Sequence, residues 1–421
     1  MNYQSPLDQF APNTFNADAL KIALAEKTLI GPSEFALDML PAGLLMREAL
    51  GVVPADGAEV RRLHGWPAPY DFAYTVRVCL TPQGDLLAMV VAGEAQGWGF
   101  ERKTNEMLAY RSSDGGDSWE GPVRPWETAY SEHAFNPLIP EGSNRIYAFG
   151  TDFHPDFRCH PFTGVLGIRH SDDDGRTWSE VRRVTPVNDP EMRGVFHMQG
   201  CETRKGTWLL GSYTIEHGGP DGRIDHQYVL RSEDQGHTWT LLPGPRPSGW
   251  RWPVNDRMME GRVIPGLGDT VLMFTRTCEG HVWVLRSEDD GVTWSEPEPT
   301  TLVHPDAPPM FCWSGDGSVL ISLIHNRAGG WFEGRQQLWV SLSHDGGATW
   351  TEPGFLMANA AEPLRDEPCS TQVSYADLLA KDGILHVFLD HGCRQILHAR
   401  IPEAALRDLP TRHQLEFMQP A

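Results

Sequence analysis

Short apolar segments recur along this chain at a nearly constant interval. Each begins near a Gly, Asp or Arg and is rich in β-branched, aromatic and leucine side chains. They cover residues 84–91, 145–149, 206–210, 269–274, 317–323 and 383–389. A second apolar segment follows each one, such as 227–231 or 281–286. Short segments of this composition between turn residues are typical of β-strands, so the pattern predicts an all-β protein built from one repeated unit.

In the first five repeats the second strand runs into a turn of constant sequence, S-x-D-x-G-x-[TS]-W. The turn begins at Ser112, Ser171, Ser232, Ser287 and Ser343, which are 59, 61, 55 and 56 residues apart. Its Asp can accept hydrogen bonds from backbone N–H groups of its own turn, and its Gly supplies a positive φ. The Trp is expected to place a large apolar ring in the core just beyond. We therefore predict five copies of one hairpin turn with a structural role.

The repeats also predict how the sheets are arranged. Four-stranded sheets repeated radially at this period form a β-propeller, which protects its edge strands by closing the ring. We predict a six-bladed β-propeller with five marked turns and a short, partly helical N-terminal extension. The sixth repeat has no marked turn, and we expect strands from near Tyr70 to Leu80 to complete its sheet. The predicted parts are an N-terminal extension at 1–65, the propeller at 66–405 and a C-terminal tail at 406–421.

Within the extension, residues 19–29 and 35–50 are rich in Ala and Leu at helix-compatible spacing. The second segment is interrupted by Asp38, Pro41 and Arg47 and is too short to cross a membrane. No signal peptide is evident. We expect the extension to pack on the propeller or to form the contact of a homo-oligomer.

Charge and cysteine content narrow the range of partners. The formal net charge of −21 argues against nucleic acid or an anionic membrane as a partner, but a few Arg in one pocket can still bind an anionic small molecule. Seven dispersed Cys without a C-x-x-C pair fit reduced thiols in a cytoplasmic protein. The group of Asp and His between 152 and 160 has spacings that match no standard metal site, and we expect neither a metal nor a cofactor.

The marked turn resembles the Asp-box, or BNR repeat, of the sialidase (neuraminidase) superfamily, and the resemblance covers most of the chain. It implies a six-bladed propeller that hydrolyses glycosides. Asp-boxes also occur in other glycosidases, in lyases and in non-catalytic propellers, so the function depends on the site rather than on the fold.

Sialidases resemble one another in a second set of residues. Three Arg clamp the substrate carboxylate, a Tyr acts as nucleophile with a Glu as its base, and an acidic residue is the acid/base. A guanidinium matches a carboxylate with a two-pronged, permanently charged fork. A neutral Tyr suits an anionic sugar better than a carboxylate nucleophile does, and it needs a neighbouring base.

Several segments are similar to this family pattern. The segment MMEGRV at 258–263, followed one strand later by FTRT, implies Glu260 as the base and Arg276 as one Arg of the clamp. Arg335 stands eight residues before a marked turn, as the third Arg of the family does. The segment around Tyr375 is similar to that of the nucleophile.

Two positions depart from the family pattern. The R-I-P tripeptide of the first Arg is absent, and Arg77, seven residues before the Gly of the first strand, is the candidate for its place. No Asp lies between Asp85 and Asp114, so Glu101 is the candidate acid/base, with Glu94 as the other choice. A Glu can also act as a general acid.

Three functional hypotheses follow. The first is an exo-glycosidase that removes a terminal acidic sugar from a carbohydrate substrate with the residues named above. The second is a glycosidase or lyase that acts on another sugar, such as a uronate or rhamnose, with His197 at a blade entrance binding substrate or acting as acid or base. The third is a non-catalytic propeller that binds a glycan or a partner.

Overall fold

The described part of the chain is built from β-strands. The computed structural model describes residues 50–52, 58–65, 72–93, 106–126, 135–152, 164–193, 195–218, 223–252, 256–328, 334–359, 372–393 and 395–412. Among these residues the longest helical element is the short 3₁₀ helix η4 (Glu403–Asp408). The all-β prediction is therefore confirmed. The helices expected at 19–29 and 35–50 lie outside the described residues, except that Leu50 begins strand β1.

The chain divides into two compact units, which are described separately. Unit 1 consists of Met1–Val76, Cys278–Val282 and Thr300–Ala421, and unit 2 consists of Arg77–Thr277 and Trp283–Pro299.

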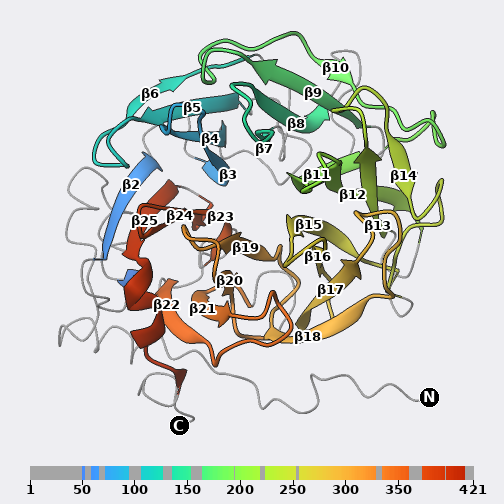
Figure 1. Ribbon diagram of the computed structural model, residues 1–421. Coiled ribbons are helices and arrows are strands. Elements are labelled where there is room, and N and C mark those ends of the chain that lie inside the picture. The colour runs from blue at the N-terminus through green and yellow to red at the C-terminus, as the bar shows by residue number, and fades with distance from the viewer. Residues whose placement is uncertain are drawn as a thin grey trace. The chain divides into compact units, whose positions relative to one another are not determined.

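Unit 2 contains most of three sheets (Figure 1). The first has the order β3 (Phe72–Leu80), β4 (Leu86–Gly93), β5 (Glu106–Ser112), β6 (Glu120–Val123). The second has the order β7 (Asn136–Leu138), β8 (Ile146–Asp152), β9 (Val165–Ser171), β10 (Arg182–Arg183). The third, eight-stranded sheet contains β11 (Val195–Glu202), β12 (Trp208–His217), β13 (Arg223–Ser232), β14 (Thr240–Leu242), β15 (Met259–Pro265), β16 (Val271–Arg276), β17 (His281–Ser287) and β18 (Glu298–Val303).

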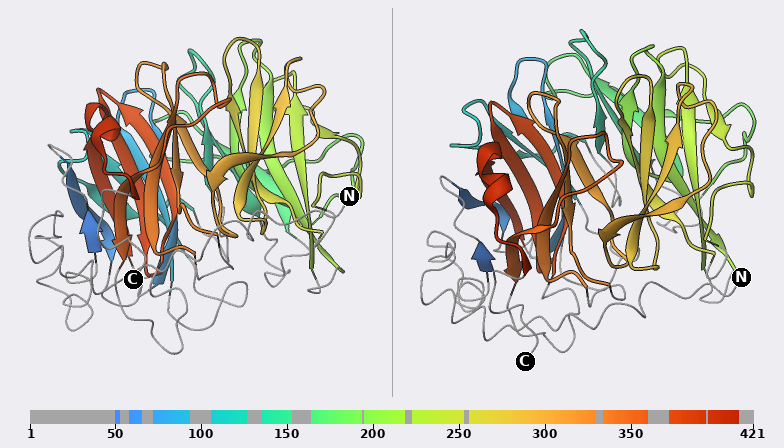
Figure 2. Two further views of the ribbon diagram at one scale, coloured as in Figure 1. Left: turned by 90° about the horizontal axis from the view of Figure 1, so that it is seen from below. Right: turned by 60° about the horizontal axis from the view of Figure 1, so that its bottom comes forward.

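The eight-stranded sheet is two copies of the four-stranded unit. Its order is β14-β13-β12-β11-β15-β16-β17-β18, and the two halves meet at one parallel pair, Gln199 opposite Arg262. Five further pairs in this sheet are antiparallel, namely β11–β12, β12–β13, β13–β14, β15–β16 and β16–β17. Figure 2 shows the green to yellow-green strands of this sheet running side by side. The period seen in the sequence therefore corresponds to one four-stranded antiparallel sheet.

Unit 1 contains two further sheets. One has the order β1 (Leu50–Val52), β22 (Gly354–Asn359), β21 (Gln337–Ser343), β20 (Leu320–Ile324), β19 (Met310–Trp313). The other has the order β2 (Glu59–Gly65), β25 (Gln395–Pro402), β24 (Ile384–His391), β23 (Val373–Lys381).

The prediction for the sixth sheet was wrong. The segment expected to complete it, Tyr70 to Leu80, instead contributes β3 to the first sheet. A short turn joins β3 to β4, with the Thr81 N–H donating to Asp85 O at 2.8 Å. Because strands that follow each other through a short turn usually pair, β3 pairs with β4 and not with the sixth sheet. The sheet is completed by β2, from Glu59 opposite Arg400 to Gly65 opposite Gln395. Figure 1 shows β2 in blue beside β25 in red.

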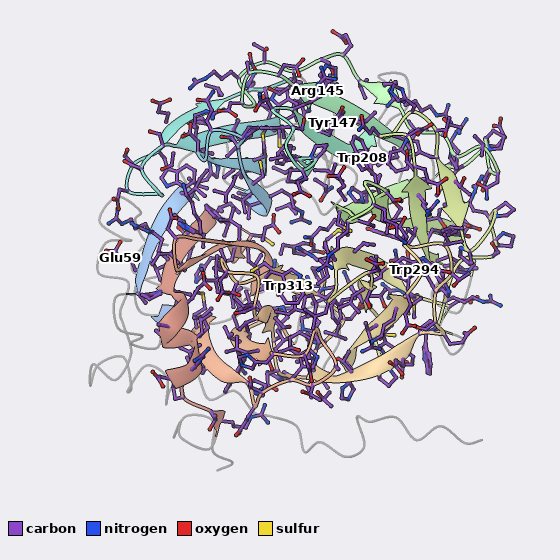
Figure 3. All side chains as sticks on the ribbon, viewed as in Figure 1. Glu59, Arg145, Tyr147, Trp208, Trp294 and Trp313 are labelled. Carbon is purple, nitrogen blue, oxygen red and sulfur yellow. The ribbon has the colours of Figure 1, made fainter. Side chains whose placement is uncertain are left out.

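Consecutive sheets of unit 2 pack through apolar faces. Trp208 and Trp239 are almost fully buried between the second sheet and the first half of the third. Figure 3 shows Arg145, Tyr147 and Trp208 close together there, with the Tyr147 and Trp208 rings 4.7 Å apart. Burial of aromatic rings of this size is the main stabilising contribution to such a contact.

The marked turns share one set of hydrogen bonds. In all five, the Ser Oγ donates to Asp Oδ1 at 2.7–2.9 Å and accepts from the Gly N–H at 2.7–2.9 Å. The second hydroxyl residue donates its N–H to Asp Oδ1 at 2.8–2.9 Å and its hydroxyl to Asp Oδ2 at 2.5–2.7 Å. The carboxylate therefore closes the turn, as the sequence indicated. Of the five Trp rings only Trp239 is buried. The expectation of a core ring at every turn was therefore wrong, because the other four rings are half-buried. Trp178, Trp239 and Trp294 all donate the indole N–H to the carbonyl of the turn's own Gly at 3.1 Å, so this bond forms with either degree of burial.

Candidate active site

The first strands of three four-stranded units each contain a β-bulge: β11 and β15 in the two halves of the eight-stranded sheet, and β23 in unit 1. In β15 two residues, Glu260 and Gly261, lie between consecutive pairs with β16 where β16 has one. In β23 Tyr375 and Ala376 do the same opposite β24. The bulge of β11 falls at Met198. A bulge takes residues out of the ladder and re-aims their side chains, and bulges are frequent next to active sites.

Glu260 and Tyr375 also have a left-handed backbone, with φ of 53° and 45°. The other non-glycine residues of the described part with positive φ lie in turns or loops. This conformation costs an L-residue about 1–2 kcal/mol, and strain of this kind concentrates at functional sites. The predicted base and the predicted nucleophile therefore share an unusual backbone geometry.

Glu260 forms a buried ion pair with Arg276. The Arg276 Nη1 donates to Glu260 Oε2 at 2.7 Å. The Glu260 side chain is 4% exposed and the Arg276 side chain is 2% exposed. Arg276 ends β16, the strand that pairs with β15, so the bulge directs the carboxylate at the neighbouring strand. A charged pair shielded from water holds a well-defined orientation.

Arg77 is buried on β3 and is linked to the strand of His197. The Arg77 Nε donates to Asn136 Oδ1 at 3.1 Å, and an Nη of Arg77 lies 3.7 Å from Met198 Sδ. The Asn136 Nδ2 in turn donates to His197 O at 2.9 Å. The amide of Asn136 therefore ties together β3, β7 and β11.

The His197 ring is buried and uncharged at neutral pH. Its Nδ1 lies 2.9 Å from Gly211 O, and because a carbonyl only accepts, Nδ1 carries the proton. Burial, together with the nearby positive charge of Arg77, lowers the pKa of His197 to about 3 despite that bond. This geometry favours a supporting role for His197 over that of a general acid at neutral pH.

One apolar cluster joins the Glu260–Arg276 ion pair to the contacts of Arg77 with the His197 strand. Met198, which contacts Arg77, and Met259, which precedes Glu260, pack together with Phe196, Tyr213 and Ile215. The structure thus links four of the predicted residues within unit 2 through direct contacts, Asn136 and this apolar cluster: Arg77, His197, Glu260 and Arg276.

The remaining described candidates, Arg335 and Tyr375, meet in unit 1. The Arg335 Cζ lies 5.2 Å from the centre of the Tyr375 ring, within the range of a cation–π contact. Arg335 is fully buried, and one Nη donates to Asp306 O at 2.6 Å. Its own carbonyl accepts the N–H of Val373 at 2.8 Å, which fixes the start of β23 next to the bulge.

The other sequence predictions belong neither to the contacts in unit 2 nor to the Arg335–Tyr375 pair in unit 1. Glu101 and Glu94 lie outside the described residues, as does 153–160 of the Asp and His group. Among the described residues, no set of three or more His, Cys, Asp or Glu side chains is placed to hold a metal ion. The same part of the chain contains no helix of the length and apolarity needed to span a membrane.

Sequence reasoning missed Asn136, the bulges themselves, and Gln227, whose Oε1 accepts from the Gly261 N–H in the β15 bulge at 2.8 Å. Asn136 and Gln227 are ordinary polar residues in strand-like segments, and nothing in the chain marks them. The one available signal was Gly261 directly after Glu260, since a Gly within a strand often indicates a bulge.

The model of the BNR repeat-like domain matches residues 128–387, more than half of the chain. The chain therefore belongs to the BNR repeat-like family.

Two curated relatives show how broad that group is. The xyloglucanase Xgh74A of Acetivibrio thermocellus is 24% identical over 258 residues, which cover 57% of this chain and 28% of the xyloglucanase. A sialidase of Bacteroides fragilis is 24% identical over 272 residues, which cover 57% of this chain and 47% of that sialidase. The chain thus matches between about a quarter and a half of the length of these relatives.

Solved sialidases have the same fold. The Hadza microbial sialidase Hz136 aligns with a TM-score of 0.61 at 18% identity, over 79% of this chain and 66% of that one. The NanB sialidase of Streptococcus pneumoniae aligns with a TM-score of 0.61 at 11% identity, over 83% and 71% of the two chains.

Proposed function

We propose that this protein is a retaining exo-glycosidase of the sialidase type that removes a terminal acidic sugar. The observation that carries the proposal is the pair of matching bulges, which give Glu260 and Tyr375 a left-handed backbone and place each beside a buried Arg. Strained backbone that a fold maintains in two repeats, at the two positions indicated by the family resemblance, fits catalytic use better than a purely structural role.

In the proposed first step, the Tyr375 hydroxyl oxygen attacks the anomeric carbon while Glu260 takes the hydroxyl proton. The bond from the anomeric carbon to the leaving oxygen breaks, and Glu101 gives that oxygen a proton. In the second step Glu101 removes a proton from water, the water oxygen replaces Tyr375 on the anomeric carbon, and Glu260 returns the proton to Tyr375. Two displacements retain the configuration of the sugar.

Arg276, Arg335 and Arg77 are proposed to hold the carboxylate of the substrate. Guanidinium groups suit this role because each presents a fixed pair of donors and stays charged. The proposal includes the six-bladed propeller as the scaffold, supported by the repeated four-stranded sheets and by the fold of the solved sialidases.

The test is hydrolysis of aryl glycosides of sialic acid, a uronic acid and rhamnose, together with xyloglucan. We expect turnover of the sialoside, and a kcat for Tyr375→Phe lower by about 100-fold or more, which corresponds to about 2.7 kcal/mol of transition-state stabilisation. Tyr147→Phe is the matched control, because it removes a phenol hydroxyl from a half-buried ring elsewhere. A fluorinated sialoside that traps the intermediate should add its mass to the peptide containing Tyr375.

Other results would contradict the proposal in different ways. Hydrolysis of another sugar that is unaffected by Tyr375→Phe would assign the chemistry to other residues. If the wild-type protein hydrolyses none of the substrates, a glycan-binding role becomes the better explanation.

A further inference from the structure

Gln227 has a fully buried side chain whose amide bonds to three backbone groups. Its Nε2 donates to Ser212 O at 2.8 Å and to Tyr228 O at 2.9 Å, and its Oε1 accepts from the Gly261 N–H at 2.8 Å. Because each backbone partner can only donate or only accept, these bonds determine which way the amide points. Gln227 lies on β13, and Gly261 lies in the bulge of β15.

The bond to Gly261 supplies a partner that the strand ladder does not. Within the bulge, Glu260 and Gly261 are the two residues outside the regular pairing with β16. A buried N–H without a partner is unfavourable, and the oxygen of Gln227 satisfies this one. The fit is close: a Cβ at position 261 would lie 2.6 Å from the amide carbon of Gln227.

The opposite side of the bulge is held as closely. A Cβ at Gly211 would lie 2.1 Å from Gly261 O, so β12 reaches the bulge only because position 211 is a glycine. The Gly211 carbonyl accepts in turn from His197 Nδ1. Gln227 and the pair of His197 and Gly211 therefore fix both the N–H and the carbonyl side of residue 261.

We propose that Gln227 is a positioning residue for Glu260. By holding the Gly261 N–H, it keeps Glu260 in the left-handed conformation that lets its carboxylate accept from Arg276. The inference rests on the proposed function, in which Glu260 is the base. Gln227 itself does not contact the reacting atoms.

Two readouts test this role, and one of them does not depend on activity. In Gln227→Met, which keeps the length of the side chain but loses the amide, hydrogen exchange of the Gly261 amide should be at least tenfold faster. With 4-methylumbelliferyl sialoside, kcat should fall about 10- to 100-fold while KM changes less than threefold. The acidic limb of the pH profile of kcat/KM should also move, because the base is displaced.

Asn188→Leu is the matched control. Asn188 also bonds backbone through its amide, accepting from Leu241 N at 2.8 Å and donating to Leu241 O at 2.9 Å, but it lies away from the bulge. It should lower the melting temperature and leave the pH profile unchanged. Gln227→Glu, whose buried carboxyl in its protonated form keeps an oxygen for Gly261, should recover most of kcat. If Gln227→Met does not fold, Gln227→Asn serves instead, because its side chain is shorter by one methylene and its amide lies farther from Gly261. It should show the same changes in amide exchange, kcat and pH profile.

Wild-type kcat and an unchanged pH profile in Gln227→Met would overturn the inference and leave the proposed function intact. Unchanged exchange at Gly261 would overturn it as well. If the wild-type protein is inactive on all the glycosides, the proposed function fails, and faster exchange at Gly261 would still support Gln227 as the residue that holds the bulge.

Discussion

At the scale of single residues, unusual backbone geometry points to the site more clearly than residue type does. Glu, Arg and Tyr are common on strands, and none of them is distinctive alone. A left-handed Glu260 and a left-handed Tyr375 within strands are distinctive, because a side chain with a Cβ disfavours that conformation. The strain persists because surrounding bonds, such as that from Gly261 to Gln227, hold the chain in place.

The buried ion pair gives a prediction at this scale. Glu260→Gln keeps the shape of the side chain but removes the negative charge beside Arg276. We expect kcat to fall about 100- to 10,000-fold, as for loss of a general base. We also expect a loss of about 3 kcal/mol in the free energy of unfolding, because one charge of a buried pair loses its partner. Kinetics with the sialoside and urea unfolding measure the two effects.

Glu298→Gln provides the comparison for that variant. Glu298 pairs with Arg286 at an exposed position, where an ion pair contributes little. It should change neither kcat nor the urea midpoint noticeably. An active and stable Glu260→Gln protein would contradict the assignment of Glu260 as a buried base.

At the scale of elements, the marked turn could be predicted from the sequence and the bulge could not. Every bond that closes the turn joins residues at most four apart, so the order of residue types was sufficient. The β15 bulge is held by Gln227, 34 residues earlier in the chain. No local pattern records such a contact.

Asp289→Ala tests the structural role of the turn. The Asp289 carboxylate accepts from the Thr293 hydroxyl and N–H and from Ser287, and these bonds lower its pKa to about 2. Removing them should lower the free energy of unfolding by about 1 kcal/mol, because the position is exposed and water replaces part of each bond. The sialoside kcat should be unchanged.

Urea unfolding at pH 7 measures this effect, with the neighbouring exposed acid changed in Glu288→Ala as the control. Equal midpoints for the two variants would argue against a stabilising role for the turn. A large loss of kcat in Asp289→Ala alone would place the turn in the active site.

At the scale of the whole molecule, buried neutral histidines make stability depend on pH. Burial lowers the pKa of His386 and His391 in unit 1 to about 4, and that of His197 in unit 2 to about 3. Each is therefore lower in the folded protein than the ordinary value of 6.5. Such groups stabilise the fold fully above pH 6.5, and their contribution is lost as pH falls toward 4.

We expect the urea midpoint to fall steadily between pH 7 and pH 5, by an amount that corresponds to about 1 kcal/mol or more per buried histidine. The turn carboxylates do not contribute to this change. The pKa of Asp289 is lowered from 3.8 to about 2, so its stabilisation is complete above about pH 4 and is lost only below it. His386→Gln should reduce the slope, and a midpoint that stays constant from pH 7 to pH 5 would contradict the prediction.

Much of the fold could be predicted from the order of residues in the chain, but less of the candidate site could be. The alternation of apolar strands and marked turns predicted the sheets, because strand composition and turn chemistry act over a few residues. The pairing of β2 with β25 was not predictable, since it joins residues more than 300 positions apart and any strand of suitable composition could fill that edge.

The candidate residues were identified because their types follow one another in the order seen in sialidases, and their catalytic roles stay predictions. The structure alone established which of them meet: Glu260 with Arg276 across a bulge, Arg335 over the Tyr375 ring, and Arg77 with the His197 strand through Asn136. The reason is physical. Turns and strands depend on neighbours in the chain, whereas the position of a buried charge depends on hydrogen bonds and close contacts from strands that only folding brings together.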